Sequence, residues 1–183
     1  MTPIIMENFL PEPMQDELVR ALMGHKFPWK LYQNTNTTDE ATQPADSAQF
    51  VHGFIQNYKT FSPWATVPQA ITTRLGISND KIIRAKSNIV AREKSWFAHP
   101  KHIDDDQPHW VFIYYVNDAD GDTLLYEGDE ITHRIAPKRG RAVVFDGACW
   151  HASSPPVDAN FRCIINYNLA RDVPEETFRK YAA

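Results

Sequence analysis

The spacing of apolar residues changes character near residue 82. Before that point, apolar residues recur at helical spacing. Residues 11–23, with Leu18 and Leu22 on one face, predict a helix that ends at Gly24. Residues 62–75 predict a second helix, ended by Gly76 and carrying Pro63 in its first turn. Residues 1–10 and 27–32 favour short strands, whereas 49–58 fits neither period. Residues 174–183 favour a short helix.

After residue 82, short apolar or alternating runs follow one another, separated by turn residues. Alternation of this kind is typical of strands, and many short strands at close spacing predict a β-sandwich or barrel. We therefore expect one domain over 1–183: helical support and a substrate loop in 1–80, a β-core in 81–170 and a tail in 171–183. The predicted strands are 82–90, 109–116, 123–126, 130–135, 141–145 and 161–169.

The segment 34–47 is polar and long for a connection inside a compact domain. Loops of this length are often binding segments or lids. We expect either a substrate lid or an ordinary surface loop here.

Composition narrows the class of protein. The net charge of −4 gives no general attraction to nucleic acid or to anionic membranes. The two cysteines, Cys149 and Cys163, do not make a disulfide framework and are expected to be reduced core residues. No signal peptide and no apolar run long enough for a membrane span is evident, so we expect a soluble, cytoplasmic protein.

His102-Ile103-Asp104 is the first sign of chemistry in the sequence. In a strand, residues i and i+2 face the same side, so this imidazole and carboxylate can bind one metal ion. His151, just past a predicted strand, is the candidate third ligand. Two histidines and one carboxylate leave open positions and favour iron(II). Alone, however, His-x-Asp is more often a solvated turn.

Other histidines compete for this role. His99 is the main rival ligand, although the residue two positions after it is Lys101 and not a carboxylate. We expect His99, His109 and His133 to be surface or partner-contact residues.

Arg162 begins a run in which polar and apolar residues alternate. Arg162, Asn166 and Asn168 fall on one face with Ile164, and the opposite face is apolar and should pack against helices. A guanidinium inside a barrel is costly unless an anion pairs with it, and its planar fork suits a carboxylate. The alternative is an arginine at the barrel end bonded to a structural carboxylate.

These pieces, in this order, resemble the 2-oxoglutarate- and iron(II)-dependent oxygenases, in particular the prolyl-4-hydroxylase-like branch with its small bacterial and phage members. The resemblance is firm over residues 84–169 and loose over 1–83. The matching elements are His102-Ile103-Asp104, Tyr114-Tyr115-Val116-Asn117, Asp120-Gly121-Asp122-Thr123, Pro137-Lys138-Arg139-Gly140, Val143-Val144-Phe145-Asp146-Gly147, His151 and Arg162.

The resemblance implies a mainly β fold: a double-stranded β-helix (a jelly roll, cupin-like) with N-terminal helices packed on one sheet. It implies Fe(II) on His102, Asp104 and His151, with 2-oxoglutarate and O2 as co-substrates and ascorbate as a supporting reductant. It implies that Arg162 binds the distal carboxylate of 2-oxoglutarate. Further co-substrate contacts are expected from Tyr115, Asn166, Thr123 and Asn88, with Arg92 as the alternative to Asn88.

The implied activity is hydroxylation of a substrate C–H bond with release of succinate and CO2. The substrate is a prolyl or other peptide side chain, or a small molecule, and no nucleic-acid or membrane partner is expected. Two alternatives stay open: a cupin-type metalloenzyme that does not use 2-oxoglutarate, and a non-catalytic jelly-roll binding module. Aromatic residues are candidate walls of the substrate cleft: Trp29, Tyr32, Trp96, Phe97 and Trp150.

Overall fold

The computed structural model describes residues 2–35 and 46–182. The predicted lid at 34–47 falls largely outside the described residues. The elements, in chain order, are β1 (Ile4–Met6), α1 (Glu12–Leu22), β2 (Lys30–Tyr32), β3 (Gln49–Gln56), β4 (Lys59–Thr60), α2 (Gln69–Leu75), the 3-10 turn η1 (Asn79–Lys81), β5 (Ile82–Ala91), β6 (His109–Tyr115), β7 (Thr123–Glu127), β8 (Glu130–Ile135), β9 (Ala142–Asp146), β10 (His151–Ser153), β11 (Phe161–Ala170) and α3 (Glu176–Arg179).

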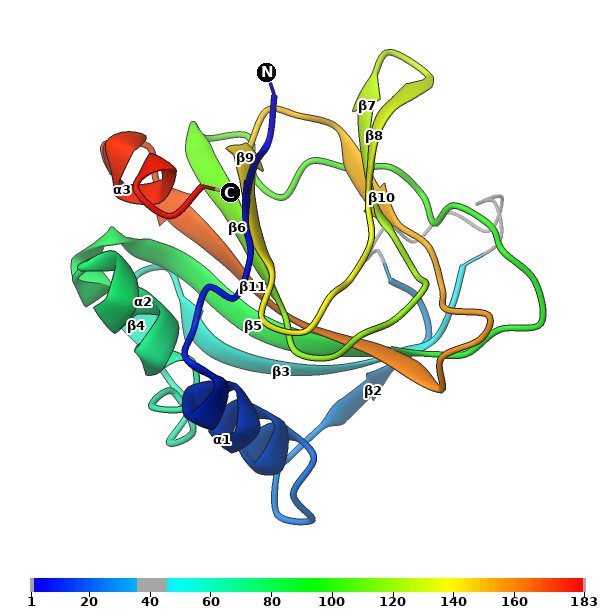
Figure 1. Cartoon of the computed structure of the whole chain (residues 1–183), viewed down its shortest axis with the longest axis horizontal. Coiled ribbons are helices and arrows are strands. Elements are labelled where there is room, and N and C mark those ends of the chain that lie inside the picture. The colour runs from blue at the N-terminus through cyan, green and yellow to red at the C-terminus, as the bar shows by residue number, and fades with distance from the viewer. Residues whose placement is uncertain (1, 36–45, 183) are drawn as a thin grey trace.

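Two antiparallel sheets face each other. Within the described residues the larger sheet has the order β1-β9-β6-β11-β5-β3-β2, with β4 paired to β3, and the smaller has the order β10-β7-β8. Figure 1 shows the helices on the outer side of the large sheet and the small sheet on its other side. This is the jelly-roll arrangement with helices on one sheet that the resemblance implied.

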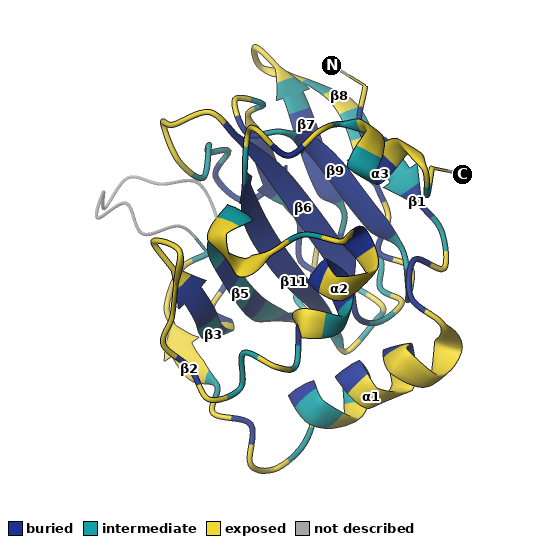
Figure 2. Ribbon diagram, turned by 90° about the vertical axis from the view of Figure 1, so that its left-hand side faces the viewer, coloured by how far each residue is buried: buried dark blue, intermediate teal, exposed yellow. Residues whose placement is uncertain are grey.

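Each face of the large sheet has its own apolar core. The outer face packs Phe112, Tyr167 and neighbouring side chains against Leu18, Leu22 and Phe178 of the helices. The inner face packs a smaller cluster between the two sheets: Val111, Ile113, Tyr115, Leu125, Ile135, Val143, Phe145 and Ile164. In Figure 2 the central strands are buried almost throughout, whereas the helices expose their outward faces. The central strands of the large sheet are thus shielded from water on both sides, whereas the edge strands β2 and β4 are exposed.

The central strand β11 shows how the sequence pattern becomes two faces. It pairs with β5 on one side and with β6 on the other, both antiparallel. Cys163, Ile165 and Tyr167 belong to the outer core, as the alternation predicted, whereas Ile164 belongs to the inner one. Arg162 therefore points between the sheets, where the candidate site lies.

The predicted helix over 62–75 is too long. The helix observed is α2, Gln69–Leu75, which follows Pro68 and ends at Gly76 with φ +70°. Proline has no backbone N–H to donate and disfavours helical backbone in the residue before it. Residues 69–75 therefore form the predicted helix, whereas residues 62–68 form turns.

The first 80 residues hold more strand than the sequence indicated. Residues 49–58, which fitted neither period, contain the strand β3, paired with β5 over most of its length. The predicted strand 27–32 is confined to β2, Lys30–Tyr32, paired with β3. Among the helices of residues 2–35 and 46–182, none is long and apolar enough to cross a membrane.

Candidate metal centre

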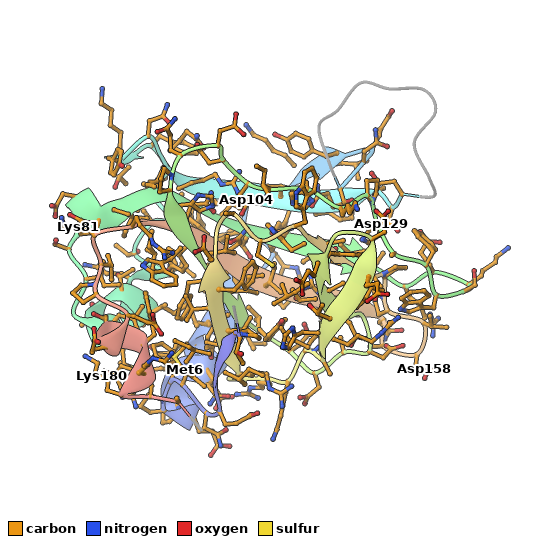
Figure 3. The ribbon with its side chains drawn as sticks, turned by 90° about the horizontal axis from the view of Figure 1, so that it is seen from above. Met6, Lys81, Asp104, Asp129, Asp158 and Lys180 are labelled. Carbon is orange, nitrogen blue, oxygen red and sulfur yellow. The ribbon has the colours of Figure 1, made fainter. Side chains whose placement is uncertain are left out.

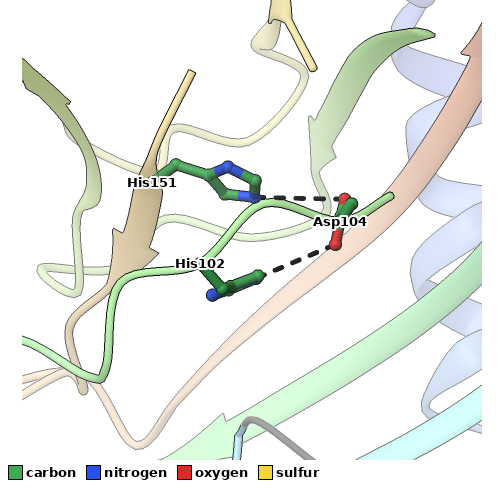
Figure 4. A group of neighbouring side chains, drawn as sticks. All are labelled: His102, Asp104 and His151. Carbon is green, nitrogen blue, oxygen red and sulfur yellow. Dashed lines mark ion pairs between the residues drawn. The ribbon is translucent and has the colours of Figure 1, made fainter. Parts of the chain in front are cut away.

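Three predicted ligands come together between the sheets. One ligand atom from each of His102, Asp104 and His151 lies within 4.8 Å of the others. Nε2 of His102 is 3.7 Å from Oδ1 of Asp104, and Nε2 of His151 is 3.9 Å from Oδ2. Figure 4 shows the carboxylate of Asp104 beside the two rings, with one dashed line to each. Ligand atoms about 2.1 Å from one ion lie roughly 3–4 Å apart, so this spacing suits a shared metal.

Backbone pairing sets the positions of the two histidines. His151 begins β10, and an isolated antiparallel bridge joins it to His102. Each backbone N–H donates to the other's carbonyl at 2.9 Å. Residues that face each other across an antiparallel pair have neighbouring side chains, and the ring centroids are 4.6 Å apart. Asp104 follows His102 by two residues and reaches the same side.

Asp104 is held ionised by its surroundings. Its side chain is 3% exposed, and Figure 3 shows it well inside the molecule, whereas Asp158 lies at the periphery. Nη2 of Arg84 is 2.6 Å from Oδ1, and Nδ2 of Asn166 donates to Oδ2 at 3.2 Å. Burial alone would raise the pKa of this carboxyl, but nearby positive charge, first that of Arg84 and then that of Lys86, outweighs it and holds the pKa well below its usual range.

The two imidazoles are neutral at physiological pH. Burial, assisted by the neighbouring His151, lowers the pKa of His102 to about 4, and burial also lowers the pKa of His151. Nδ1 of His151 lies 3.0 Å from the carbonyl of Cys149, which fixes its tautomer with Nε2 as the lone-pair nitrogen. Metals bind the neutral imidazole, so the site needs little proton release to load an ion.

Arg162 is a buried cation beside this cluster. Its side chain lies in a cavity that also contains His102, His151, Asn166 and Ser153. The residue is 2% exposed, its Nη2 donates to Oγ1 of Thr123 at 2.8 Å, and its Nε has no partner among the described residues. No carboxylate in that part of the chain pairs with it, which removes the structural-carboxylate alternative there. A buried guanidinium with a free donor favours an anionic ligand.

The other predicted co-substrate residues differ in how they reach this cavity. Thr123, Asn166 and Asn88 line it, and Oδ1 of Asn88 and of Asn166 are buried without partners among the described residues. Tyr115 does not line it; its hydroxyl donates to Thr123 at 2.7 Å from behind. Arg92 lies beyond the end of β5 and is exposed, away from the cavity.

The expectation that His99 and His109 are surface residues is wrong. His99 is 3% exposed and His109 is fully buried. The ring of His99 bonds Ser153 at 2.8 Å through Nδ1 and Ser47 at 3.1 Å through Nε2, so both its nitrogens are engaged and it is not a ligand here. Burial lowers its pKa to about 4. No local pattern around His99 indicates these partners, because Ser47 and Ser153 are about 50 residues away on either side.

A cleft of about 620 Å³ opens from the metal cluster to the surface. It lies between β2 and β3 on one side and the segment carrying His102 and Asp104 on the other. Of the aromatic residues proposed for its wall, Tyr32 alone is among its described lining residues, and Phe61 joins it. Trp29 instead packs against the outer core, and Trp96 lies beneath Arg134.

Two basic residues of the site, Arg84 and Lys86, were not predicted from the sequence. Both lie on β5, on the inner face with Asn88, because their partners across β11 are Asn168 and Asn166. The signal was available: Arg84, Lys86 and Asn88 alternate in the same way as the polar face of β11. On β5, as on β11, three polar residues on one strand face indicate a face that points into the site.

Comparison with known proteins identifies this fold. No protein-family model matches the chain, and no curated protein sequence matches it significantly. Solved structures do match. A structure described as an oxidoreductase of the 2OG-Fe(II) oxygenase family from Burkholderia pseudomallei aligns with a TM-score of 0.67 at 13% identity, covering 92% of this chain and 85% of that one.

Two further matches carry the name prolyl hydroxylase. A Pseudomonas putida prolyl-4-hydroxylase aligns with a TM-score of 0.54 at 14% identity, covering 92% of both chains. A Trichoplax adhaerens prolyl hydroxylase, in complex with a peptide fragment of the hypoxia inducible factor oxygen degradation domain, aligns with a TM-score of 0.60 at 12% identity, covering 99% of this chain and 87% of that one. At these identities the likeness establishes the fold, and it confirms the jelly roll expected from the sequence.

Proposed function

We propose that this protein is a 2-oxoglutarate- and iron(II)-dependent oxygenase that hydroxylates a C–H bond of its substrate. The observation that carries the proposal is the pairing of two features in one cavity. His102, Asp104 and His151 form a facial set of two imidazoles and a carboxylate, which is typical of iron(II) sites with open positions. Arg162 supplies a buried cation in the same cavity, and no carboxylate of residues 2–35 and 46–182 forms an ion pair with it.

In this proposal one group of residues binds the iron and another binds the co-substrate. The three ligands hold iron(II), and Arg162 with Thr123 binds the distal carboxylate of 2-oxoglutarate. Bound together with O2, iron and 2-oxoglutarate would supply the oxidation: one oxygen atom enters the substrate C–H bond and the other enters succinate, as the co-substrate loses CO2. The amide oxygens of Asn88 and Asn166, which have no partner among the described residues, belong to side chains that line the same cavity.

The cleft beside the ligands is the substrate entrance in this proposal. It is large enough to admit a peptide side chain or a small molecule, and a structural neighbour is a prolyl hydroxylase bound to a peptide fragment. A prolyl or other peptide side chain is therefore one substrate class to test. A metalloenzyme that does not use 2-oxoglutarate would have no need of Arg162, and a binding module would have no need of the ligand set.

Binding and turnover test the proposal together. We expect the wild-type protein to bind Mn(II), an iron substitute suited to magnetic resonance, and to release succinate from 2-oxoglutarate with Fe(II) and O2. His151→Ala should lose Mn(II) binding because two ligands remain. Arg162→Met should retain Mn(II) but lose 2-oxoglutarate affinity by about 100-fold, since a charged hydrogen-bonded pair is removed.

Exposed residues provide the controls. His25→Ala and Arg179→Met change the same residue types far from the cavity and should behave as wild type in both assays. Wild-type Mn(II) affinity in His151→Ala would refute the ligand assignment, and unchanged 2-oxoglutarate affinity in Arg162→Met would refute the co-substrate site.

A further inference from the structure

The cleft is basic apart from the metal ligand. Among its described lining residues the cations are Lys30, Arg84 and Lys86, and the one carboxylate is that of Asp104. Arg84 is already matched, because its guanidinium lies 2.6 Å from Asp104. Lys30 is exposed on β2 at the rim. The remaining charge is Lys86, beside the metal ligands.

Lys86 occupies the junction between the cleft and the inner cavity. It lines both spaces. On β5 it pairs with Gly53 of β3 on one side and with Asn166 of β11 on the other. Gly53 has no side chain, but the ring of Phe61 lies over it, 2.6 Å from the position of a Cβ. Asn166 is bonded to Asp104. Lys86 therefore stands at the level of the metal carboxylate and faces the cleft, which Phe61 also lines.

The ammonium of Lys86 makes no ion pair within 4.0 Å and no side-chain hydrogen bond in the described part of the chain. Burial and the charge of Arg84 lower the pKa of Lys86 to about 8, although the charge of Asp104 acts in the opposite direction. Lys86 therefore still carries its proton at neutral pH. A partly desolvated ammonium without a partner is unfavourable, and an anion bound beside it would offset that cost.

The backbone positions of Lys86 and of Arg162, which would bind the distal carboxylate of the co-substrate, lie apart along the strands. Arg162 pairs with Val90, whereas Lys86 lies four residues earlier on β5. Four residues of strand span about 13 Å. Both side chains nevertheless line the inner cavity, so 2-oxoglutarate itself is the competing ligand of Lys86.

We infer that the primary substrate carries a carboxylate and that Lys86 binds it, next to the C–H bond that is oxidised. This inference rests on the proposed function and narrows its substrate class. One ammonium balances one carboxylate, whereas a phosphate dianion would require a second free cation at the same depth, and Arg84 is already paired with Asp104. Fitting substrates are free amino acids, carboxyl-terminal residues and acidic side chains.

Matched acid and amide probes test the inference by binding alone. The full chain is loaded with Mn(II) and saturated with 2-oxoglutarate, and N-acetyl amino acids are compared with their carboxamides by ligand-observed NMR. The paramagnetic ion broadens the signals of probes that bind near it. We expect acids to bind at least about tenfold more tightly than amides, as loss of one charge pair in a partly buried site implies.

Variants of one residue locate the contact. Lys86→Met, which has a similar length but no charge, should remove the preference for acids, and Lys86→Arg should keep most of it. Lys30→Met at the rim is the matched control and should change acid binding by less than about threefold, as expected for an exposed charge. Equal binding of acids and amides by the wild type, no binding of any acid, or an undiminished preference in Lys86→Met would each overturn the inference.

The co-substrate's own carboxylate is the competing occupant. Lys86→Met should keep 2-oxoglutarate affinity within about threefold of wild type, and a loss of tenfold or more would assign Lys86 to the co-substrate and overturn the inference. Failure of the proposed function would look different, because the wild type would then bind neither Mn(II) nor 2-oxoglutarate.

Discussion

At the scale of single residues, the balance of charge around Asp104 organises the site. Its buried carboxylate accepts from Arg84 and from Asn166, one partner on each oxygen. Without a metal, Arg84 is the nearest full positive charge to that carboxylate. A divalent ion bound by the triad would supply a second one.

Replacing Arg84 tests this balance. In the metal-free protein we expect Arg84→Met to lower the free energy of unfolding by about 1–3 kcal/mol, because it leaves a buried carboxylate with a single amide donor. Asp104→Asn added to Arg84→Met should recover part of the loss. Urea unfolding of the wild type, Arg84→Met, Asp104→Asn and the double variant forms a double-mutant cycle that measures the coupling.

The same variant makes a second measurement possible. Saturating Mn(II) should raise the melting temperature of Arg84→Met more than that of the wild type, since the ion replaces the missing charge. An equal or smaller rise would show that Arg84 does not balance Asp104.

At the scale of elements, two connections hold the small sheet against the large one. Asp120, between β6 and β7, accepts backbone N–H groups of Val157, Asp158 and Ala159 between β10 and β11. These bonds, on balance, lower the pKa of Asp120 despite partial burial. Gly121 follows, and a Cβ there would lie 2.6 Å from the carbonyl oxygen of Ser154 and 2.8 Å from the nitrogen of Pro156. At Gly121 the two connections therefore touch backbone to backbone.

Gly121→Ala should separate these connections. Because the added methyl meets backbone and not a movable side chain, we expect a loss of about 1–3 kcal/mol in the free energy of unfolding. Gly128→Asn is the control: Gly128 has φ +60° and open space around its Cβ position, and asparagine tolerates that backbone. Chemical unfolding of both variants measures the difference, and equal stabilities would contradict the close approach.

At the scale of the whole molecule, buried neutral histidines tie stability to pH. His99 joins Ser47, near the start of β3, to Ser153 of β10, and its folded pKa is about 4 compared with an ordinary value of 6.5. Between these values the unfolded chain binds a proton that the folded protein does not. Stability should therefore fall as pH falls through this window.

Replacing His99 isolates its share of this dependence. Between about pH 7.5 and about pH 5, His99 should account for a loss of about 2 kcal/mol in the unfolding free energy. The amide of His99→Gln can still bond the two serines but does not titrate. Over this pH range the variant should therefore lose about 2 kcal/mol less unfolding free energy than the wild type loses. Urea unfolding of the metal-free proteins at the two pH values checks it, and parallel pH dependences would show that His99 titrates normally.

Much of the fold and the centre of the site could be predicted from the chain itself. Alternation over 161–169 identified the two faces of β11, and local turn residues marked most strands of the β-core. His102 and Asp104 were predictable because a two-residue spacing fixes their common side whatever surrounds them. The role of Arg162 as an anion-binding residue was predictable because a cation on the inward face of a strand needs an anion beside it. These are properties of short segments, which a sequence carries directly.

Tertiary structure decided what depends on residues far apart in the chain. The bridge between His102 and His151 joins segments 49 residues apart by number, and no local period encodes it. The same holds for Ser47 and Ser153 around His99, for Arg84 on Asp104, and for β3, whose mixed pattern becomes a strand when it pairs with β5. Pairing across the sheet fixes these contacts because it is the partner strand, and not the local sequence, that brings each side chain to its place.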